Sequence, residues 1–360
     1  MRSVVVHRPG GYDRLCIESR PDPLPGPGEV RVRVQAIGVN YADCIVRMGL
    51  YESAKKLVGW PITPGFEVAG VVDGMGEAGG EAGGEGLTDL APGTTVLALT
   101  RFGGYATHVV VPRHQVFAVP PGFTIAEAAT FPAVYLTAYY ALHELAHPRP
   151  GAKILVHSAA GGVGCALLQL GKLAGCTMIG VVGASSKVDV ARRFGADAVI
   201  DKSREPLWPS AARHAPWGYD VVLDANGVST LRESYRHLRS PGKLVVYGFH
   251  SILPRAREGS ASAGAAGRVR WLPLARDWLR TPRFNPLALT GDNKSVLAMN
   301  LSYLFEERAF LDAAMTALLG WARDGSIAPL PVRTFALDAV AEAHRALESA
   351  LTVGKLALVP

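Results

Sequence analysis

A short glycine-containing turn between a strand and a helix constrains the fold of this chain of 360 residues more than any other feature. The apolar run Lys153–Ser158 predicts a buried strand, and the apolar run Cys165–Ala174 predicts a helix directly after the turn. Between them, Ala159, Gly161 and Gly164 form an A-x-G-x-x-G variant of the dinucleotide-binding fingerprint. The pattern therefore predicts a βα unit that receives a phosphate group.

Each small residue of the turn has its own physical role. Gly161 lets the main chain approach a pyrophosphate, and Gly164 allows the helix to pack closely on the strand. The helix N-terminus adds free N–H donors and the positive end of its dipole. A turn that only connects two elements is the alternative, but the strand before it and the later βα units favour dinucleotide binding. The expected contacts are Ala159, Ala160, Gly161, Gly162, Val163 and Gly164.

The remaining sequence divides into a β-rich first third and an alternating part. Runs of β-branched residues separated by Pro and Gly predict strands at Val4–Val6, Glu29–Val34 and Val68–Val72. After Phe123, a capping box of Thr124 and Glu127 predicts the start of a helix. Strands and helices then alternate, at Thr177–Val182, Val188–Phe194, Ala198–Ile200, Val221–Asp224 and Leu244–Tyr247. This alternation predicts an α/β fold with a doubly wound parallel sheet.

Loops and a C-terminal region complete this organisation. Gly74–Gly93 is rich in glycine and acidic residues and is expected to be a mobile loop, and Ser251–Arg270 is also expected to be a loop. Helices near Asp312–Asp324 and Leu337–Ser349 are expected to precede a last strand at Gly354–Val359.

Composition and charge exclude several classes of protein. Apolar residues make up 49% of the chain and charged residues 19%, which excludes wholesale disorder. No apolar stretch reaches about 18 residues and the N-terminus lacks a long apolar signal core, so we expect no membrane span and a cytoplasmic location. The formal net charge of +6 is too diffuse to indicate a nucleic-acid partner. The 4 cysteines form no Cys-x-x-Cys pair and are expected to be reduced core thiols.

The strand after the glycine turn favours NADPH over NADH. An NAD site usually ends that strand with Asp or Glu, which binds the ribose 2′-hydroxyl. This chain has no acidic residue there, and it has instead two hydroxyls and an ammonium group that suit a phosphate. The alternative is that Ser185 only caps the next helix and Lys187 is a solvated lysine. The expected contacts with NADPH are Gly183, Ser185, Ser186 and Lys187.

Several motifs carry a family resemblance over essentially the whole chain. They are Gly38–Asp43, Arg47–Tyr51, Pro64–Gly70, Tyr135–Tyr139, Ala159–Gly164 and Val353–Leu356. With them the chain resembles the medium-chain dehydrogenase/reductase superfamily, in particular the zinc-free quinone oxidoreductases and their vesicle amine transport protein-like members. The resemblance implies a Rossmann domain at 124–265 inserted into a GroES-like catalytic domain, which is formed by 1–123 and completed by 266–360. It also implies an active site in the cleft between the two domains.

The zinc ligands of the superfamily are missing from this sequence. Zinc alcohol dehydrogenases of the superfamily have a Cys where this chain has Asn40, and a His-Glu pair where it has Phe66 and Glu67. A catalytic zinc needs about three protein ligands, and Phe66 cannot coordinate a metal while Asn40 is a poor ligand. Gly74–Gly93 lacks the cysteines of the structural zinc loop, and Cys44 is expected to be a small buried apolar residue. We therefore expect no metal.

Without a Lewis acid, simple alcohol oxidation loses its main electrostatic support. The resemblance therefore implies NADPH-dependent hydride transfer to a conjugated carbonyl such as a quinone, an enone or a 2-alkenal, whose oxygen delocalises the incoming charge. Relatives are commonly homodimers through edge-to-edge pairing of the nucleotide-domain sheets. The apolar strand Leu244–Tyr247 is expected to provide such an edge.

Three polar residues in one segment are the expected catalytic groups. Asn40 would donate its amide to the substrate oxygen or the nicotinamide ribose, unless it only forms a turn at a strand end. Tyr51 would supply a phenolic donor or proton, and Tyr41 is a similar candidate, although both rings could equally only pack. His157 lies in a buried strand and is expected to be a satisfied core histidine, and no Ser–His–Asp arrangement stands out in the sequence.

The resemblance implies further contacts with the cofactor, at Thr137, Tyr247, Asn300, Phe305 and Lys355. Thr137 could instead bond back to a helical carbonyl, and Lys355 could be only a surface charge. Asp43 and Arg47 lie four residues apart, so they are expected to pair and to hold the loop that carries Asn40. Glu67 is expected to be a local hydrogen-bond acceptor.

Two other functions stay open at this point. One is an NADPH-binding interaction protein with weak or no reductase activity, because vesicle amine transport protein-like members are associated with membranes and partner proteins. The basic segment Arg255–Arg270, with Trp271 and Trp278 nearby, would then lie on an anionic lipid surface, although an exposed linker before an ordinary cationic helix is favoured. The other is a biosynthetic enoyl reductase, which the same fold and cofactor would serve.

Overall fold

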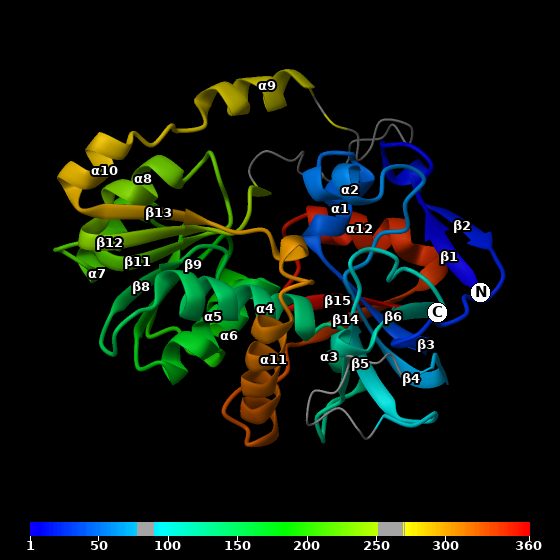
Figure 1. The fold of residues 1–360 in the computed structure, drawn as a ribbon. Coiled ribbons are helices and arrows are strands. Elements are labelled where there is room, and N and C mark those ends of the chain that lie inside the picture. Colours follow the sequence, from blue (N-terminus) through cyan, green and yellow to red (C-terminus); the bar gives the residue numbers. More distant parts are fainter. Residues whose placement is uncertain (78–89, 251–268, 270) are drawn as a thin grey trace. The chain divides into compact units, whose positions relative to one another are not determined.

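The computed structural model describes residues 1–77, 90–250, 269 and 271–360. Most of the loops predicted at Gly74–Gly93 and Ser251–Arg270 lies outside these described residues. The described chain forms two compact units, of which unit 1 contains residues 1–133 and 301–360 and unit 2 contains residues 134–250 and 271–300. The chain therefore begins in unit 1, builds unit 2 and returns to complete unit 1 (Figure 1).

Unit 2 is built on a parallel sheet of six strands with the order β10-β9-β8-β11-β12-β13. Numbered along the chain, this order is 3-2-1-4-5-6, the doubly wound arrangement in which the winding reverses between β8 and β11. The strands are β8 (Lys153–Val156), β9 (Thr177–Val182), β10 (Ala198–Asp201), β11 (Tyr219–Asp224), β12 (Leu238–Val246) and β13 (Lys294–Ala298). The predicted α/β class with a doubly wound parallel sheet is confirmed.

The helices of unit 2 alternate with its strands, as the 3.6-residue periodicity predicts. Their packing buries an apolar cluster that includes Leu155, Ile179, Val222 and Leu244, each at most 2% exposed. The elements are α4 (Pro132–Tyr139), the π-helical η3 (Tyr140–Ala146), α5 (Gly162–Leu173), η4 (Ser185–Lys187), α6 (Val188–Arg193), α7 (Leu207–His214), α8 (Leu231–Arg236), α9 (Trp271–Arg280) and α10 (Pro286–Asp292). No helix of the described chain combines the length and the apolar character that a membrane crossing requires.

The strand at the edge of this sheet differs from the predicted one. Leu244–Tyr247 was expected to be an edge, but β12 pairs with β11 on one side and with β13 on the other, so the prediction is wrong. Lys294–Ala298 forms a short strand, β13, that begins with the polar residues Lys294 and Ser295 and has no fully buried residue, so its sequence pattern is weak. β12 also begins earlier than predicted, at Leu238, because it continues through Pro241, a residue that sequence rules treat as a strand breaker.

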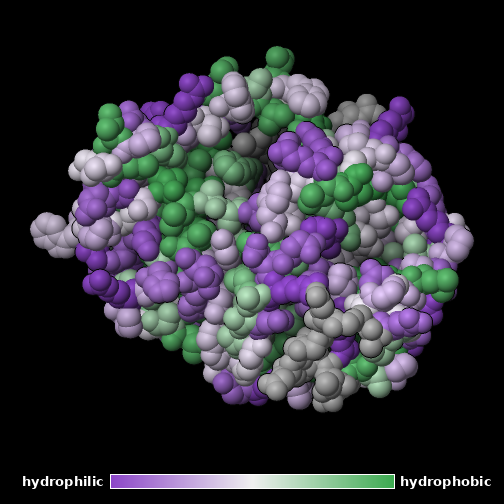
Figure 2. All heavy atoms as spheres, in the orientation of Figure 1, coloured by the Kyte–Doolittle hydropathy of each residue, from purple (hydrophilic) through white to green (hydrophobic). Residues whose placement is uncertain are grey.

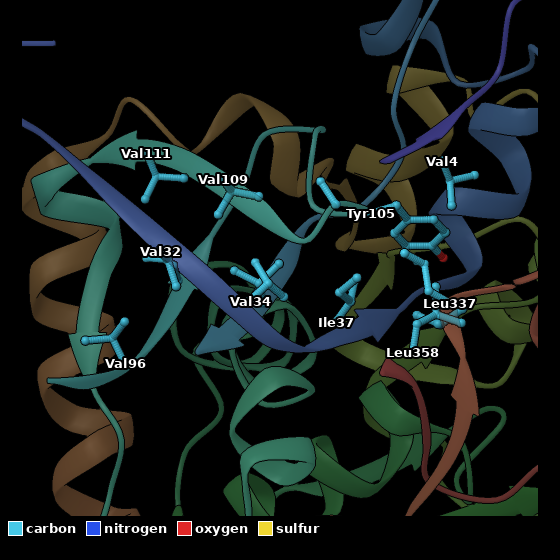
Figure 3. Close-up of a cluster of buried hydrophobic side chains, with 14 of the residues drawn as sticks. Val4, Val32, Val34, Ile37, Val96, Tyr105, Val109, Val111, Leu337 and Leu358 are labelled. Atoms are coloured by element: carbon cyan, nitrogen blue, oxygen red, sulfur yellow. The ribbon is translucent and has the colours of Figure 1, made fainter. Parts of the chain in front are cut away.

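Unit 1 is built on a sheet of seven strands. The order is β14-β15-β3-β4-β5-β7, with β6 also paired to β3, and a separate hairpin joins β1 (Arg2–Val5) to β2 (Cys16–Ser19). The sheet strands are β3 (Glu29–Val39), β4 (Glu67–Met75), β5 (Thr95–Leu99), β6 (His108–Pro112), β7 (Val116–Ala118), β14 (Val332–Ala336) and β15 (Lys355–Val359). Their alternating Val and Ile residues fill one core, in which Val32, Val34 and Ile37 follow one another along β3 and Val109 of β6 belongs to the same cluster (Figure 3).

The helices of unit 1 position the ends of these strands. They are η1 (Tyr12–Arg14), α1 (Tyr41–Arg47), α2 (Glu52–Leu57), η2 (Arg113–Gln115), α3 (Ile125–Ala129), η6 (Leu301–Tyr303), α11 (Arg308–Arg323), η7 (Leu337–Ala339) and α12 (Val340–Glu348). The predicted capping box at the start of α3 is confirmed. The Thr124 N–H donates to Glu127 Oε2 at 2.8 Å, and the Glu127 N–H donates to Thr124 Oγ1 at 3.3 Å.

Candidate active site

Asn40 stands where β3 ends and α1 begins. Its backbone is extended, with φ of −118° and ψ of 153°, so it is the N-cap residue of α1. The Asn40 N–H donates to Asp43 Oδ2 at 2.8 Å, which satisfies a donor that the helix itself leaves open. Asp43 therefore holds the segment that carries Asn40, as expected. Arg47 was expected to pair with Asp43, but its ion pair is with Glu348, at 2.9 Å.

Two charged side chains fix the orientation of the Asn40 side-chain amide. Asn40 Nδ2 donates to Glu67 Oε1 at 2.9 Å, and Lys355 Nζ donates to Asn40 Oδ1 at 2.7 Å. An ammonium only donates and a carboxylate only accepts, so the amide oxygen must face Lys355 and the amide nitrogen must face Glu67. The nitrogen carries two hydrogens, and Glu67 accepts one of them. The other hydrogen of Asn40 Nδ2 can donate to a ligand.

The Glu67–Lys355 ion pair is buried inside unit 1. Lys355 Nζ lies 2.9 Å from Glu67 Oε1 and 3.1 Å from the carbonyl oxygen of Val39, and the two side chains are 4% and 0% exposed. Glu67 Oε2 accepts from the Ala133 N–H at 2.8 Å. The expected role of Glu67 as a local hydrogen-bond acceptor is confirmed, and the alternative of Lys355 as a surface charge is wrong. A contact between Lys355 and a cofactor stays a prediction.

This ion pair requires a glycine beside it. A Cβ atom on Gly38 would lie 2.3 Å from Glu67 Oε1 and 2.5 Å from the carbonyl oxygen of Ala129, both inside van der Waals contact. The Gly38 in the motif before Asn40 therefore gives Glu67 the space to reach the amide.

An aromatic cluster lies in the same unit, formed by Tyr51, Phe66 and Phe102. The ring centroids are 5.7 Å apart for Tyr51 and Phe66, 5.1 Å for Phe66 and Phe102, and 6.2 Å for Tyr51 and Phe102. Burial raises the pKa of Tyr51 to about 12, although Ser302 and Ser53 hydrogen-bond to it and lower it. The phenol therefore stays protonated at neutral pH. Tyr41 is the first residue of α1 and is half-buried, and its catalytic role stays a prediction.

One group of potential metal ligands occurs within the described residues. Cys44, His344 and Glu348 bring their ligand atoms within 4.8 Å of one another. The guanidinium of Arg47 already lies there, with Nη1 2.9 Å from Glu348 Oε1 and 3.2 Å from His344 Nδ1. Because this cation balances the carboxylate and donates to the imidazole nitrogen, the group does not suit a second cation.

In unit 2, the glycine turn joins β8 to α5 with the geometry that its sequence predicts. Ser158 has a φ of +54°, and its carbonyl oxygen accepts from the Gly161 N–H at 2.9 Å. A Cβ atom on Gly164 would lie 2.4 Å from that oxygen and 2.7 Å from Ala159 Cα, so only glycine fits. A Cβ atom on Gly161 would meet only the Ser158 oxygen, at 3.3 Å. The turn thus allows a ligand to come close to the main chain at Gly161. It requires glycine at position 164, where α5 packs closely against Ser158 and Ala159.

A cluster of basic side chains surrounds the end of β9. Ser185 Oγ donates to Asp201 Oδ2 at 2.5 Å and accepts from Arg204 Nε at 3.0 Å, so the hydroxyl is engaged with these residues. Lys187 is half-buried, and burial lowers its pKa, with the nearby charge of Lys202 as a smaller cause. Ser186 and Gly183 are exposed beside them.

Lys202 and Arg204 were missed in the sequence analysis. The signal that could have found them is the strand order, because β10 pairs in parallel with β9 and places Asp201 opposite Val182. Residues that follow two neighbouring parallel strands share one edge of the sheet.

The other predicted contacts are divided between the two units. In unit 2, Thr137 is half-buried within α4, Asn300 is half-buried after β13, and Tyr247 donates its hydroxyl to the carbonyl oxygen of His157 at 3.3 Å. In unit 1, Phe305 is 1% exposed, and its carbonyl oxygen accepts from His114 Nε2 at 3.4 Å. Lys355 lies with Asn40, as described. Their contacts with a cofactor stay predictions.

The structure also brings together a buried serine, histidine and aspartate in unit 2, which sequence analysis did not find. His157 Nε2 lies 3.1 Å from Ser234 Oγ, and Ser234 Oγ donates to Asp224 Oδ2 at 2.7 Å. All three are 0% exposed, and the serine hydroxyl faces the carboxylate. Asp224 also accepts from the Asn226 N–H at 2.8 Å. Asp224 therefore holds the turn after β11. His157 is a core histidine as predicted, but it is not fully satisfied, because its buried Nδ1 has no hydrogen-bond partner among the described residues.

Comparisons with known proteins agree with this architecture. Residues 26–121 match the family described as alcohol dehydrogenase GroES-like domain, and residues 194–358 match the family described as zinc-binding dehydrogenase. The chain is 34% identical over 362 residues to the synaptic vesicle membrane protein VAT-1 homolog of Rattus norvegicus, with 100% of this chain and 84% of that protein covered. The expected GroES-like domain is confirmed.

Two solved structures are similar over the full length of both chains. Escherichia coli quinone oxidoreductase complexed with NADPH superposes with a TM-score of 0.82 at 25% identity, covering 100% of each chain. A mycobacterial protein complexed with NADPH superposes with a TM-score of 0.81 at 26% identity, again covering 100% of each chain. The chain is therefore an oxidoreductase that belongs to the medium-chain dehydrogenase/reductase superfamily, in its zinc-free quinone oxidoreductase-like branch.

Proposed function

We propose that this protein transfers hydride from NADPH to a conjugated carbonyl, such as a quinone, an enone or a 2-alkenal. The observation that carries the proposal is the Asn40 amide, which Lys355 and Glu67 fix with one N–H left to donate. Metal-dependent members of this superfamily need metal ligands at the positions of Asn40 and Phe66. This chain has a hydrogen-bond donor at the first position and an apolar ring at the second. The similarity to a quinone oxidoreductase supports the choice of acceptor.

The residues of unit 2 fit NADPH. The amides of the turn at 159–164 and the N-terminus of α5 would hold the pyrophosphate, because Gly161 leaves the main chain open to it. Lys187, Lys202 and Arg204 offer cations around Ser185 for the 2′-phosphate. Two similar structures were solved with NADPH, which supports the same cofactor here.

The residues of unit 1 provide the donors that the reaction needs. NADPH, when bound, would supply the hydride. The Asn40 N–H would donate to the acceptor oxygen, where negative charge develops, and conjugation spreads that charge so that a neutral donor is sufficient. The Tyr51 hydroxyl, protonated up to about pH 12, would be a second donor. The rings of Phe66 and Phe102, which are 4% and 7% exposed, would make the surroundings of a flat conjugated acceptor apolar.

An absorbance assay of NADPH oxidation tests the reaction. We expect turnover with naphthoquinone, phenanthrenequinone or 2-alkenals, and a fall in kcat of about a hundredfold in Asn40→Ala, as for other donors to a developing oxyanion. Asn285→Ala is the matched control, because Asn285 only caps α10 through its contact with the Leu287 N–H at 2.9 Å. A protein that binds NADPH tightly but reduces no acceptor would contradict the proposal. Faster reduction of an enoyl thioester than of any quinone would favour the enoyl reductase alternative.

The cofactor preference has its own test. Arg204→Ala and Lys187→Ala should each weaken NADPH binding by about tenfold and leave NADH binding unchanged, because one charge-assisted hydrogen bond to phosphate is lost. Arg239→Ala is the control, since Arg239 pairs with Asp220 at the start of β11. Equal affinity of the unmodified protein for NADH and NADPH, measured by fluorescence titration, would remove the preference.

A second candidate function is attachment to an anionic membrane surface through α9. Trp271, Leu272, Trp278 and Leu279 on this helix are 68%, 87%, 67% and 72% exposed, and Arg280 is exposed with them. Figure 1 shows α9 apart from the strands of unit 2, and Figure 2 shows hydrophobic side chains on the surface over it. Exposed Trp and Leu beside arginine suit the headgroup region of a membrane.

Cosedimentation with vesicles tests this second candidate. The unmodified protein should sediment with phosphatidylserine-containing vesicles, and the double variant L272S/L279S should lose this binding, because the apolar face of α9 is removed. Leu287→Ser is the control, since Leu287 is an 81% exposed leucine on α10. Equal sedimentation of all three proteins, or none of the unmodified protein, would exclude the function.

A further inference from the structure

A series of hydrogen-bonded, buried side chains in unit 1 begins at Arg47 of α1, passes through His344 of α12 and ends at Asp43, whose carboxylate accepts from the N-cap residue Asn40. Arg47 Nη1 lies 3.2 Å from His344 Nδ1, and His344 Nε2 lies 3.1 Å from the Tyr105 hydroxyl. The Tyr105 hydroxyl lies 3.1 Å from Asp43 Oδ2. All four side chains are 0% exposed. The contacts of Arg47, His344 and Tyr105 given above do not involve the Asn40 amide, so the proposed reaction does not yet explain them.

The direction of each hydrogen bond in this chain follows from the chemistry of its ends. A guanidinium only donates, so His344 Nδ1 must accept from Arg47. A neutral imidazole that accepts at Nδ1 carries its proton on Nε2, and His344 Nε2–H therefore donates to the Tyr105 oxygen. The Tyr105 hydroxyl then donates to the Asp43 carboxylate. Every donor points from Arg47 toward Asp43.

The surroundings keep His344 neutral. Burial and, as a smaller cause, the charge of Arg47 hold the pKa of His344 well below its usual value. A proton on Nδ1 would face the N–H groups of Arg47, which cannot accept it. At the far end, Glu348 balances the charge of Arg47 at 2.9 Å, and the Tyr12 hydroxyl donates to Glu348 Oε2 at 2.8 Å. The chain of hydrogen bonds is thus anchored by a paired cation.

At its other end the chain reaches a carboxylate that joins two segments of the candidate active site. Asp43 Oδ2 accepts from the Asn40 N–H at 2.8 Å, and Asp43 Oδ1 accepts from the Gly65 N–H at 2.9 Å. Gly65 directly precedes Phe66 and Glu67, and Glu67 holds the Asn40 side chain. One carboxylate therefore fixes the main chain of Asn40 relative to the main chain that carries its side-chain partner.

We propose that Asp43 is a positioning residue for Asn40, and that Arg47, His344 and Tyr105 form a one-directional relay of hydrogen bonds that orients the Asp43 carboxylate. The relay itself rests only on the contacts described above. Its consequence for catalysis rests on the proposed function, in which Asn40 donates to the acceptor oxygen. A small displacement of such a donor lowers the rate of reaction far more than it lowers binding.

The first experiment examines the relay without any cofactor or substrate. Nitrogen-15 spectra of the full chain labelled at histidine, recorded at about pH 8, report which ring nitrogen of each histidine carries the proton. His344→Asn assigns the His344 signals among the 10 histidines. We expect a neutral ring with the proton on Nε2. A proton on Nδ1, or a ring that titrates near its ordinary pKa of 6.5, would overturn the relay.

The second experiment measures the consequence for the reaction. Tyr105→Phe removes the hydroxyl that joins His344 to Asp43 and keeps the ring, which packs edge-on to His344 at 5.8 Å. At about pH 8, we expect kcat to fall by about tenfold or more, with NADPH affinity and the KM of the acceptor within about twofold. Tyr219→Phe is the matched control, because it removes a buried hydroxyl that donates to the Ala211 carbonyl at 2.8 Å in unit 2. Equal kcat in both variants would overturn the proposal.

A pair of histidine variants keeps the proposal testable if Tyr105→Phe does not fold. The amide of His344→Gln reaches the position of Nε2 and can still donate to Tyr105, whereas the shorter amide of His344→Asn reaches only the position of Nδ1. We expect His344→Gln to retain more of kcat than His344→Asn, and the reverse order would contradict the relay. If the unmodified protein reduces no acceptor, the proposed function fails while the nitrogen-15 result still decides the relay.

Discussion

Two buried carboxylates, Asp224 in unit 2 and Glu67 in unit 1, are compensated in different ways. In unit 2, Asp224 is compensated locally, by the N–H groups of Asn226 and Gly227 and by the hydroxyls of Thr230 and Ser234, all within ten residues along the chain. In unit 1, Glu67 is compensated by Lys355, which lies 288 residues away in the sequence. A hydroxyl or a backbone N–H is neutral, whereas the ammonium of Lys355 brings a second buried charge.

We infer that this difference distinguishes a structural site from the proposed active site. The neutral donors around Asp224 hold the turn after β11. The ion pair of Glu67 and Lys355 fixes both ends of the Asn40 amide and leaves an N–H to donate. Buried charge is costly, and its cost is offset only while the pair stays complete. Unit 1 should therefore respond to the loss of one partner much more strongly than unit 2.

The largest expected effect is the loss of the Lys355 ammonium. Lys355→Met leaves Glu67 buried without its cation, and we expect a loss of about 3–5 kcal/mol in the free energy of unfolding. Ser234→Ala, which removes one of several donors to Asp224, should cost only about 1–2 kcal/mol. Urea denaturation of both variants gives the comparison. The double variant with Glu67→Gln should recover much of the loss, because it removes the unpaired charge.

Similar losses for Lys355→Met and Ser234→Ala would contradict the distinction between the two units. A recovery that does not appear in the double variant would show that Lys355 stabilises unit 1 through packing of its carbon chain rather than through its charge.

Features that depend on residues close together in the sequence could be predicted, whereas contacts between residues far apart in the sequence could not. The turn at 159–164 and the strands β8 and β9 were predictable because each depends on neighbouring residues, such as the apolar run before Ala159. Glu67 could be predicted to accept a hydrogen bond, but its partner Lys355 could not be predicted, because the pairing of β15 with β3 brings Lys355 to it. His344 and Tyr105 were not predictable at all, because no local pattern links them to Asp43.

The errors have the same physical origin. Leu244–Tyr247 was predicted to be a sheet edge because its apolar pattern says nothing about the strand that covers it, and β13 comes from a segment about fifty residues later. Lys202 was missed because its relation to Lys187 depends on the pairing of β10 with β9. Local periodicity identifies elements, whereas sites at the ends of strands depend on the order of the sheet.

Gly164→Ala tests the close packing of the glycine turn at 159–164 in unit 2. In Gly164→Ala the new Cβ atom would lie 2.4 Å from the Ser158 carbonyl oxygen, which belongs to the main chain and cannot move aside. We expect a loss of about 2 kcal/mol in the free energy of unfolding of unit 2. Gly320→Ala is the matched control, since Gly320 lies in α11 with no atom within 4 Å of its Cβ position and should gain up to about 1 kcal/mol. Thermal unfolding of the two variants measures the difference, and two stabilised proteins would contradict the close packing.

The smallest expected effect is a pH dependence within the relay of unit 1. Burial raises the pKa of Asp43 from 3.8 to about 7, against the hydrogen bonds of Asn40, Gly65 and Tyr105, which lower it. Between these pH values the folded protein keeps a proton on Asp43 that the unfolded chain releases, so this contribution to stability falls as the pH rises. His344 has the opposite effect on stability. Below pH 6.5 its side chain binds a proton in the unfolded chain but not in the folded protein, so this contribution to stability falls as the pH is lowered.

Each variant should therefore change the pH dependence of the unmodified protein in the opposite direction. As the pH is lowered from about 6.5 to about 5, Asp43→Asn should lose stability relative to the unmodified protein and His344→Asn should gain it, by at most about 1.4 kcal/mol per pH unit. Chemical denaturation at several pH values measures the slopes. Tyr219→Phe, which changes no residue of this relay, should keep the pH dependence of the unmodified protein, to which His157 and His250 of unit 2 also contribute because burial lowers their pKa. A change of slope with the same sign in both variants, relative to the unmodified protein, would contradict the opposite contributions of Asp43 and His344.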